Sequence, residues 1–134
     1  MKKLLLLSAL TLLQGCTLLD AYLMTHYDPN EYLLITDIRS EAQQYKNDCD
    51  NSELSKTHSI QLAQDTQRFV LYSEHTPHNE KVISASKDLH IIAQGLADQY
   101  NKGAKVSTAF CKIKFTSVET SADHMQQIIG SRPR

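Results

Sequence analysis

The chain has 134 residues, of which 41% are hydrophobic and 22% charged, and its formal net charge is −1. This length is enough for one domain with a single core. The near-neutral charge, without a basic stripe or an arginine cluster, argues against nucleic acid as a partner.

The first fifteen residues predict a secretory leader. Lys2 and Lys3 supply positive charge, and residues 4–13 are apolar apart from Ser8 and Thr11. This apolar stretch is too short to cross the roughly 30 Å hydrocarbon layer, which takes about 20 residues of helix. A charged start followed by a short apolar stretch is typical of a signal peptide, so we expect residues 1–15 to be removed. Lys+Arg then falls from 14 to 12 against 15 Asp+Glu, which leaves a net charge of −3.

The leader ends in Leu13-Gln14-Gly15-Cys16. This motif resembles the lipobox of bacterial lipoproteins. The resemblance implies that the Cys16 thiol receives diacylglycerol, that cleavage falls before Cys16, and that the new amine is acylated. Acyl chains contribute ~0.8 kcal/mol per buried methylene, so two or three chains anchor a protein stably. In that family the residue after the cysteine guides sorting, and Thr17 implies the outer membrane, facing the periplasm.

Two cysteines remain once Cys16 is assigned to lipid. In an oxidising envelope compartment, Cys49 and Cys111 are expected to form a structural disulfide. Two free thiols or a redox couple are the alternatives, but no Cys-x-x-Cys motif is present.

Three helices are predicted between residues 28 and 101. Asp28-Pro29-Asn30-Glu31 has a capping aspartate, a proline at the first helical position and a glutamate that completes a capping box. Asp50-Asn51-Ser52-Glu53 repeats this pattern, so the first helix should end near Asn47 and the second should begin near Ser52. Thr76-Pro77 ends the second helix, and Asn101-Lys102-Gly103 ends the third.

The apolar residues of these segments recur at helical spacing. They are Leu34, Ile38, Ala42, Tyr45 and Cys49 in the first; Leu54, Leu62, Phe69 and Tyr72, interrupted by His58 and Thr66, in the second; and Val82, Ala85, Leu89, Ile92, Leu96 and Tyr100 in the third.

The last segment fits two structures. Apolar residues spaced three and four apart predict a helix, and they are Cys111, Phe115, Val118, Ala122, Met125 and Ile129. Alternation over residues 110–116 instead fits a short strand, which would make the fold α+β. We favour the helix, and hence an all-α, up-down-up-down four-helix bundle stapled by one disulfide.

In this topology Cys49 and Cys111 fall at one pole, away from the membrane. The turn at residues 75–79 and the C-terminal tail then face the membrane. The expected organisation is a lipidated N-terminus and tether at 16–27, a helical domain at 28–130 and a flexible tail at 131–134.

We expect no metal, cofactor or catalytic site. His75 and His78 flank the Thr76-Pro77 turn, but zinc and copper sites need three or four converging ligands, and no His-x-x-x-His spacing is present. His58 and His90 read as half-buried polar residues, and a haem held by Met125 and a distant histidine would lack Cys-x-x-Cys-His. The serines, Ser84, Ser86 and Ser117 among them, lie in no Gly-x-Ser-x-Gly elbow. Asp88 and His90 are two positions apart on one helix and do not face each other.

The mature chain is similar to small helical lipoproteins of bacterial and tailed-phage genomes. The shared features are the helix start after Tyr27, a cysteine that ends the first helix, and the second cysteine within Phe110-Cys-Lys-Ile-Lys-Phe115. This resemblance implies no activity. We therefore expect a non-enzymatic lipoprotein that binds or occludes an envelope protein, one version being superinfection exclusion by a phage. A spanin-like lysis subunit of the outer membrane and a small-ligand carrier are the alternatives.

Overall fold

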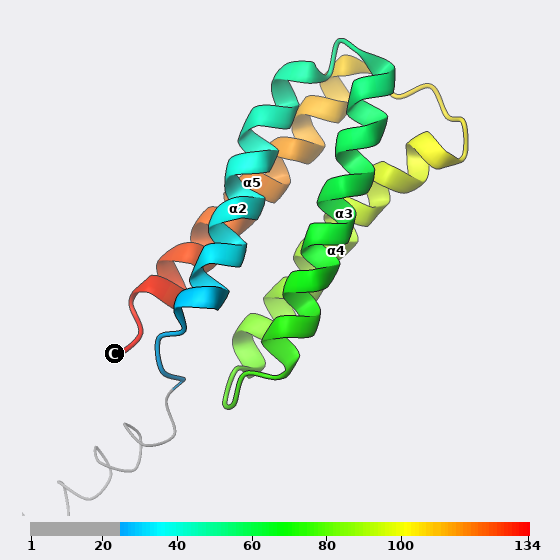
Figure 1. Ribbon diagram of the computed structural model, residues 1–134. Helices are drawn as coiled ribbons and strands as arrows, with labels where there is room; N and C mark the ends of the chain where they lie inside the picture. Colours follow the sequence, from blue (N-terminus) through cyan, green and yellow to red (C-terminus); the bar gives the residue numbers. More distant parts are fainter. Residues whose placement is uncertain (1–24) are drawn as a thin grey trace, which may run out of the picture.

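The computed structural model describes residues 25–134, and these residues form four α-helices and one short 3-10 helix. They are α2 (Pro29–Tyr45), η1 (Lys46–Asp48), α3 (Ser52–Glu74), α4 (Glu80–Asn101) and α5 (Thr108–Gly130). Successive α-helices run in opposite directions (Figure 1), so the predicted up-down-up-down bundle is confirmed. The alternative strand at residues 110–116 is wrong, because the whole of that segment lies within α5.

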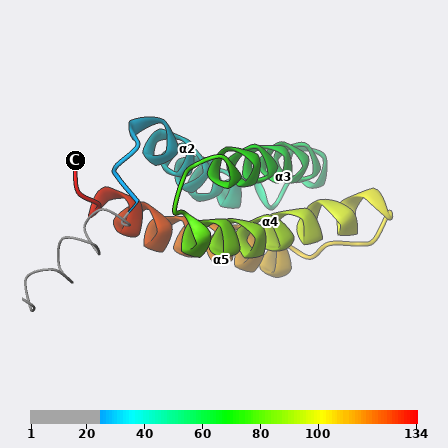
Figure 2. The ribbon, with the colours of Figure 1, turned by 90° about the horizontal axis from the view of Figure 1, so that it is seen from below.

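The four helices form two layers. Seen from below in Figure 2, α2 and α3 make one layer, and α5 and α4 make the other. Packing is most extensive between α2 and α5 and between α3 and α4. The α2–α3 and α4–α5 seams involve fewer contacts, so the bundle consists of two closely packed pairs joined along two looser seams.

The helix starts follow the capping residues of the sequence. The Asp28 side chain accepts hydrogen bonds from the backbone N–H groups of Asn30 and Glu31, at 2.8 and 3.3 Å. Asn51 caps α3 and Ser107 caps α5 in the same manner. These caps satisfy backbone donors that the first turn of a helix leaves free.

The turn after α4 depends on a glycine. Gly103 has φ +72°, a conformation that side chains other than glycine's rarely adopt. The N–H groups of Gly103 and Ala104 donate to the carbonyls of Tyr100 and Gln99, which is the Schellman arrangement. The predicted stop at this position is therefore confirmed, and the chain turns back into α5.

The core contains the predicted apolar positions of α5 and most of those of α2 and α4. All six residues predicted for α5 are buried, and Phe115 is fully enclosed. In α2 the buried position is Ile35, whereas the predicted Leu34 is only partly covered. Burying a large apolar side chain contributes about 1.5–3 kcal/mol, so this shared core is the main stabilising contribution.

The buried face of α3 is unusually polar. Ser55, Ser59, Thr66 and Ser73 are buried on it, whereas the predicted Leu54 is 39% exposed. Three of these hydroxyls, those of Ser55, Ser59 and Thr66, donate to carbonyls of their own helix, which satisfies them without a distant partner. Small side chains therefore occupy much of the buried face of α3, and Ser86, Ala93 and Ala97 are likewise buried on α4, the helix on which α3 packs most extensively.

A further difference concerns the C-terminal residues. Residues 131–134, interpreted as a flexible tail, make specific contacts with the bundle in the structure. Arg132 forms an ion pair with Glu31, and the Pro133 carbonyl accepts a hydrogen bond of 2.8 Å from the Tyr27 N–H. In the part of the chain that the structure describes, no helix is long and apolar enough to cross a membrane.

Candidate functional site

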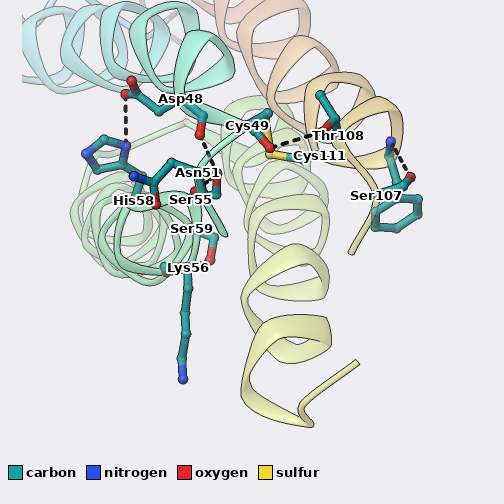
Figure 3. Close-up of a disulfide and its surroundings, with 11 residues drawn as sticks. Asp48, Cys49, Asn51, Ser55, Lys56, His58, Ser59, Ser107, Thr108 and Cys111 are labelled. Atoms are coloured by element: carbon teal, nitrogen blue, oxygen red, sulfur yellow. Dashed lines mark hydrogen bonds and ion pairs between the residues drawn. A yellow bond between two sulfur atoms is a disulfide. The ribbon is translucent and has the colours of Figure 1, made fainter. Parts of the chain in front are cut away.

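The predicted disulfide is present at one end of the bundle, which we call the disulfide pole (residues 45–58 and 107–115). Cys49 follows η1 and Cys111 lies in the first turn of α5, with their Cα atoms 5.8 Å apart. Both cysteines are buried. Figure 3 shows the hydrogen bonds that hold the chain around the two cysteines. Thr108 donates to the Cys49 carbonyl, and Ser55 donates to the Asp48 and Asn51 carbonyls.

His58 also lies at the disulfide pole. Its ring stacks on Tyr45, with 3.9 Å between the ring centroids, and its Nδ1 lies 3.3 Å from a carboxylate oxygen of Asp48. The contact joins α3 to the end of α2. His90 has a similar structural position, because its Nδ1 lies 3.1 Å from the hydroxyl of the buried Thr66.

The opposite end, which we call the terminal pole, is formed by residues 25–31, 71–82 and 128–134. At its centre is a buried polar cluster of Glu31, Asn79 and Arg132. The Glu31 side chain is fully buried, and its carboxylate accepts from the Arg132 guanidinium and from the Asn79 amide. Arg132 donates a second hydrogen bond of 2.7 Å to the Asn79 side-chain oxygen.

This cluster joins three parts of the chain. Glu31 comes from the first turn of α2, Asn79 precedes α4, and Arg132 follows α5. Asn79 also donates to the Ser73 carbonyl at the end of α3, and its side-chain oxygen accepts from Arg132 instead of capping α4. Two charges can be buried together when each is paired and hydrogen-bonded, as both are here.

The capping box predicted at residues 28–31 is thus only half correct. Asp28 caps α2 as expected, but the Glu31 side chain turns inward to Arg132 instead of back to the cap. Asp28 has a second role, because its other carboxylate oxygen accepts from the Tyr72 hydroxyl at 2.7 Å. This hydrogen bond to Asp28, which only the protonated hydroxyl can donate, and burial after it raise the pKa of Tyr72 above its usual value.

Three surface hollows surround the terminal pole. The first, of about 590 Å³, lies beside the C-terminal part of α3 and the turn after it, and it is lined by Asp28, Arg68, Leu71, Tyr72, His75, Thr76 and Pro77. The second, of about 510 Å³, lies between residues 25–29 and residues 76–78. The third, of about 370 Å³, includes Ile128 and Arg132. Leu71 and Ile128 are each more than half exposed at these hollows.

The two histidines of the α3–α4 turn do not converge on a metal position. The His75 Nδ1 is 2.9 Å from the Leu71 carbonyl of its own helix, and His78 has φ +57° and an exposed side chain. Between residues 25 and 134 no group of three or more His, Cys, Asp or Glu side chains could hold a metal ion. The hydroxyls of Ser86 and Ser117 donate to carbonyls of their own helices.

The α2–α3 seam contains a pair of facing carboxyl groups that the sequence did not indicate. Glu41 on α2 lies against Asp65 on α3, which forms an ion pair with Arg68 one turn further along. Burial, together with the nearby charge of Asp65, raises the pKa of Glu41 to about 7. Burial and these same two carboxylates raise the pKa of Tyr45 to about 12.

Comparison with known proteins identifies no relative. No family model, no curated protein and no solved structure matches the chain. The candidate lipidation residue, Cys16, and the leader lie outside the described residues. Function must therefore be argued from the sequence motif and from the two poles of the bundle.

Proposed function

We propose that this protein is a lipid-anchored, non-enzymatic binding protein of the bacterial envelope, with its terminal pole next to the bilayer. The observation that supports this most directly is the position of the lipobox-like cysteine. Cys16 precedes Thr25, the first described residue, by nine positions. At roughly 3.3–3.6 Å per extended residue, this linker spans at most about 30 Å. An acylated Cys16 would therefore keep the terminal pole within that distance of the membrane.

The surface of the terminal pole supports binding to a protein partner. Apolar side chains at Leu71 and Ile128 project beside hollows that are framed by polar residues. Apolar centres with a polar rim are common in transient protein interfaces. The partner would be an envelope protein within reach of the same membrane, and occlusion of a phage receptor is one form that this binding could take.

The spanin-like alternative has less support. A protein that bridges two membranes needs an extended structure, whereas these helices fold back on one another (Figure 1). The longest helices have 23 residues, which is about 35 Å at 1.5 Å per residue. The bundle therefore does not extend much beyond the length of one helix.

The test is position-specific crosslinking in living cells. A photoreactive amino acid is placed at Leu71 or Ile128 at the terminal pole, and at Ile91, in the middle of α4, as the matched exposed control. We expect an envelope protein to be crosslinked from the first two positions and not from the third. The crosslink should disappear in Cys16→Ser, which cannot be lipidated. Equal labelling from all three positions, or labelling that persists in Cys16→Ser, would contradict the proposal.

A further inference from the structure

The facing carboxyl groups of Glu41 and Asp65 cannot both be ionised without cost. One oxygen of Glu41, Oε2, is buried, and no donor among residues 25–134 reaches it. A buried carboxylate oxygen without a donor is unfavourable, because it has lost its water and gained no hydrogen bond. A proton on Glu41 removes the charge and supplies an O–H that donates to Asp65.

The surrounding charges favour that proton. Asp37, one turn earlier on α2, adds a third negative charge beside Glu41, and only Arg68 on α3 opposes it. Arg68 already pairs with Asp65. The pKa of Glu41 is accordingly raised to about 7, first by burial and next by Asp65.

The other charged groups near α2 lie on its far side. Arg39 of α2 pairs with Asp123 of α5, and Lys46, the first residue of η1, pairs with Glu119 of α5. At 100° per residue, Arg39 lies on the side of α2 opposite Glu41, and Lys46, the C-cap of α2, continues that side. The remaining helix, α4, packs against α3 and α5. Tyr45 lies one turn after Glu41 on α2, toward the disulfide pole. His58 of α3 stacks on the Tyr45 ring.

We propose that a single proton held between Glu41 and Asp65 closes the α2–α3 seam, and that its loss loosens this seam. This seam is less extensively packed than its neighbours, because α2 packs mainly on α5 and α3 mainly on α4. Loss of the proton leaves two adjacent carboxylates that compete for one cation, Arg68. The proton passes to water, and no other reactant is needed.

The same arginine links the carboxyl pair to the terminal pole. Arg68 lines the 590 Å³ hollow together with Leu71 and Tyr72. Ionisation of Glu41 therefore changes the charge beside one wall of this hollow. This inference concerns the folded domain and does not depend on lipidation or on a partner.

The experiment follows the proton directly in the full-length chain. The glutamate side-chain carboxyl carbons are labelled with ¹³C, and their NMR shifts are followed from pH 4 to pH 9. One glutamate is expected to titrate near pH 7, and its signal should be missing in Glu41→Gln. Titration of Glu41 near the ordinary value of 4.5 would overturn the proposal. This measurement on the unaltered chain decides the point even if a variant folds poorly.

Amide hydrogen exchange then tests the seam itself. If the opened seam lets Glu41 titrate at 4.5 and the closed seam at about 7, the opening equilibrium rises about tenfold between pH 6 and pH 8.5. The protection factors of the α2 and α3 amides beside Glu41, which already correct for the pH dependence of the intrinsic exchange rate, should fall about tenfold over this pH range. Glu41→Gln should remove this extra fall, and Asp88→Asn, an exposed acid on α4, should keep it. Protection that follows the intrinsic rate alone would refute the loosening.

Discussion

The strongest stability prediction concerns Arg132, the third-last residue of the sequence. Replacing Arg132 with Met keeps most of the apolar side-chain length and removes the guanidinium. The Glu31 carboxylate is fully buried, so the substitution leaves a buried charge with only the Asn79 amide as partner. Removing one partner of a buried ion pair costs about 3–5 kcal/mol. The free energy of unfolding is therefore expected to fall by about 3 kcal/mol or more.

Urea denaturation of the purified chain measures this loss. With an m value of roughly 2 kcal/mol per molar, a loss of about 3 kcal/mol lowers the midpoint by about 1.5 M. Arg134→Met is the matched control, because Arg134 is exposed and contacts only the face of the Tyr27 ring. Its effect should stay within about 0.5 kcal/mol.

A double variant separates the ion pair from simple loss of packing. In Glu31→Gln/Arg132→Met no buried charge remains, so this chain should be more stable than Arg132→Met alone. A free energy of unfolding for Arg132→Met within about 0.5 kcal/mol of that of the unaltered chain would contradict a buried ion pair. So would a double variant in which Glu31→Gln adds its full cost to that of Arg132→Met.

Three further predictions concern the disulfide, the core and the seam. Cys49→Ser/Cys111→Ser should lose about 4 kcal/mol, the chain-entropy value for a loop closed over a separation of 62 residues, and reduction of the unaltered chain should lower the urea midpoint similarly. Phe115→Ala should lower the free energy of unfolding by about 3–5 kcal/mol, because Phe115 is fully buried. Ile113→Ala, at a site 63% exposed, should change it by no more than about 0.5 kcal/mol. Equal losses from the two substitutions would contradict this assignment of the core. Since the folded chain holds a proton on Glu41 that the unfolded chain releases above pH 4.5, the free energy of unfolding should fall as the pH rises from about 4.5 to 7. Glu41→Gln should remove that part of the pH dependence, and unchanged curves would count against a raised pKa.

Most of the fold could be predicted because local chemistry decides it. Asp28, Asn51 and Gly103 mark helix ends by satisfying backbone groups or by adopting positive φ, and each does so in the structure. The apolar spacing of α5 predicted its buried face at every position. Assigning Cys16 to lipid left Cys49 and Cys111 as the predicted pair, and the topology agrees with it, since it brings the end of the first helix and the start of the last to one pole.

The polar cluster of the terminal pole could not be predicted in the same way. Glu31 is separated from Asn79 by 48 positions and from Arg132 by 101. Its local sequence pattern also has a satisfactory explanation as a capping box, and nothing in the spacing distinguishes the two roles. A glutamate in a first turn and an arginine near a C-terminus look like ordinary surface residues until the bundle brings them together.

The α2–α3 seam was missed for a related reason. Glu41 and Asp65 belong to segments whose apolar stripes predict helices correctly, and acids between such stripes normally face solvent. Only the rotation of α2 relative to α3 turns the two carboxyl groups toward each other.

The two ends of the bundle are held by different physical means, and this difference can be measured. The disulfide acts mainly by restricting the unfolded chain, whereas the Glu31–Arg132 pair acts only in the folded state. The two lie at opposite ends of α2, whose 17 residues span about 25 Å. Contributions that far apart with no shared partner are expected to add. Arg132→Met should therefore cost the same, within about 0.5 kcal/mol, in the oxidised and in the reduced chain. A smaller cost after reduction would mean that the terminal pole forms only when the disulfide already holds α2 against α5.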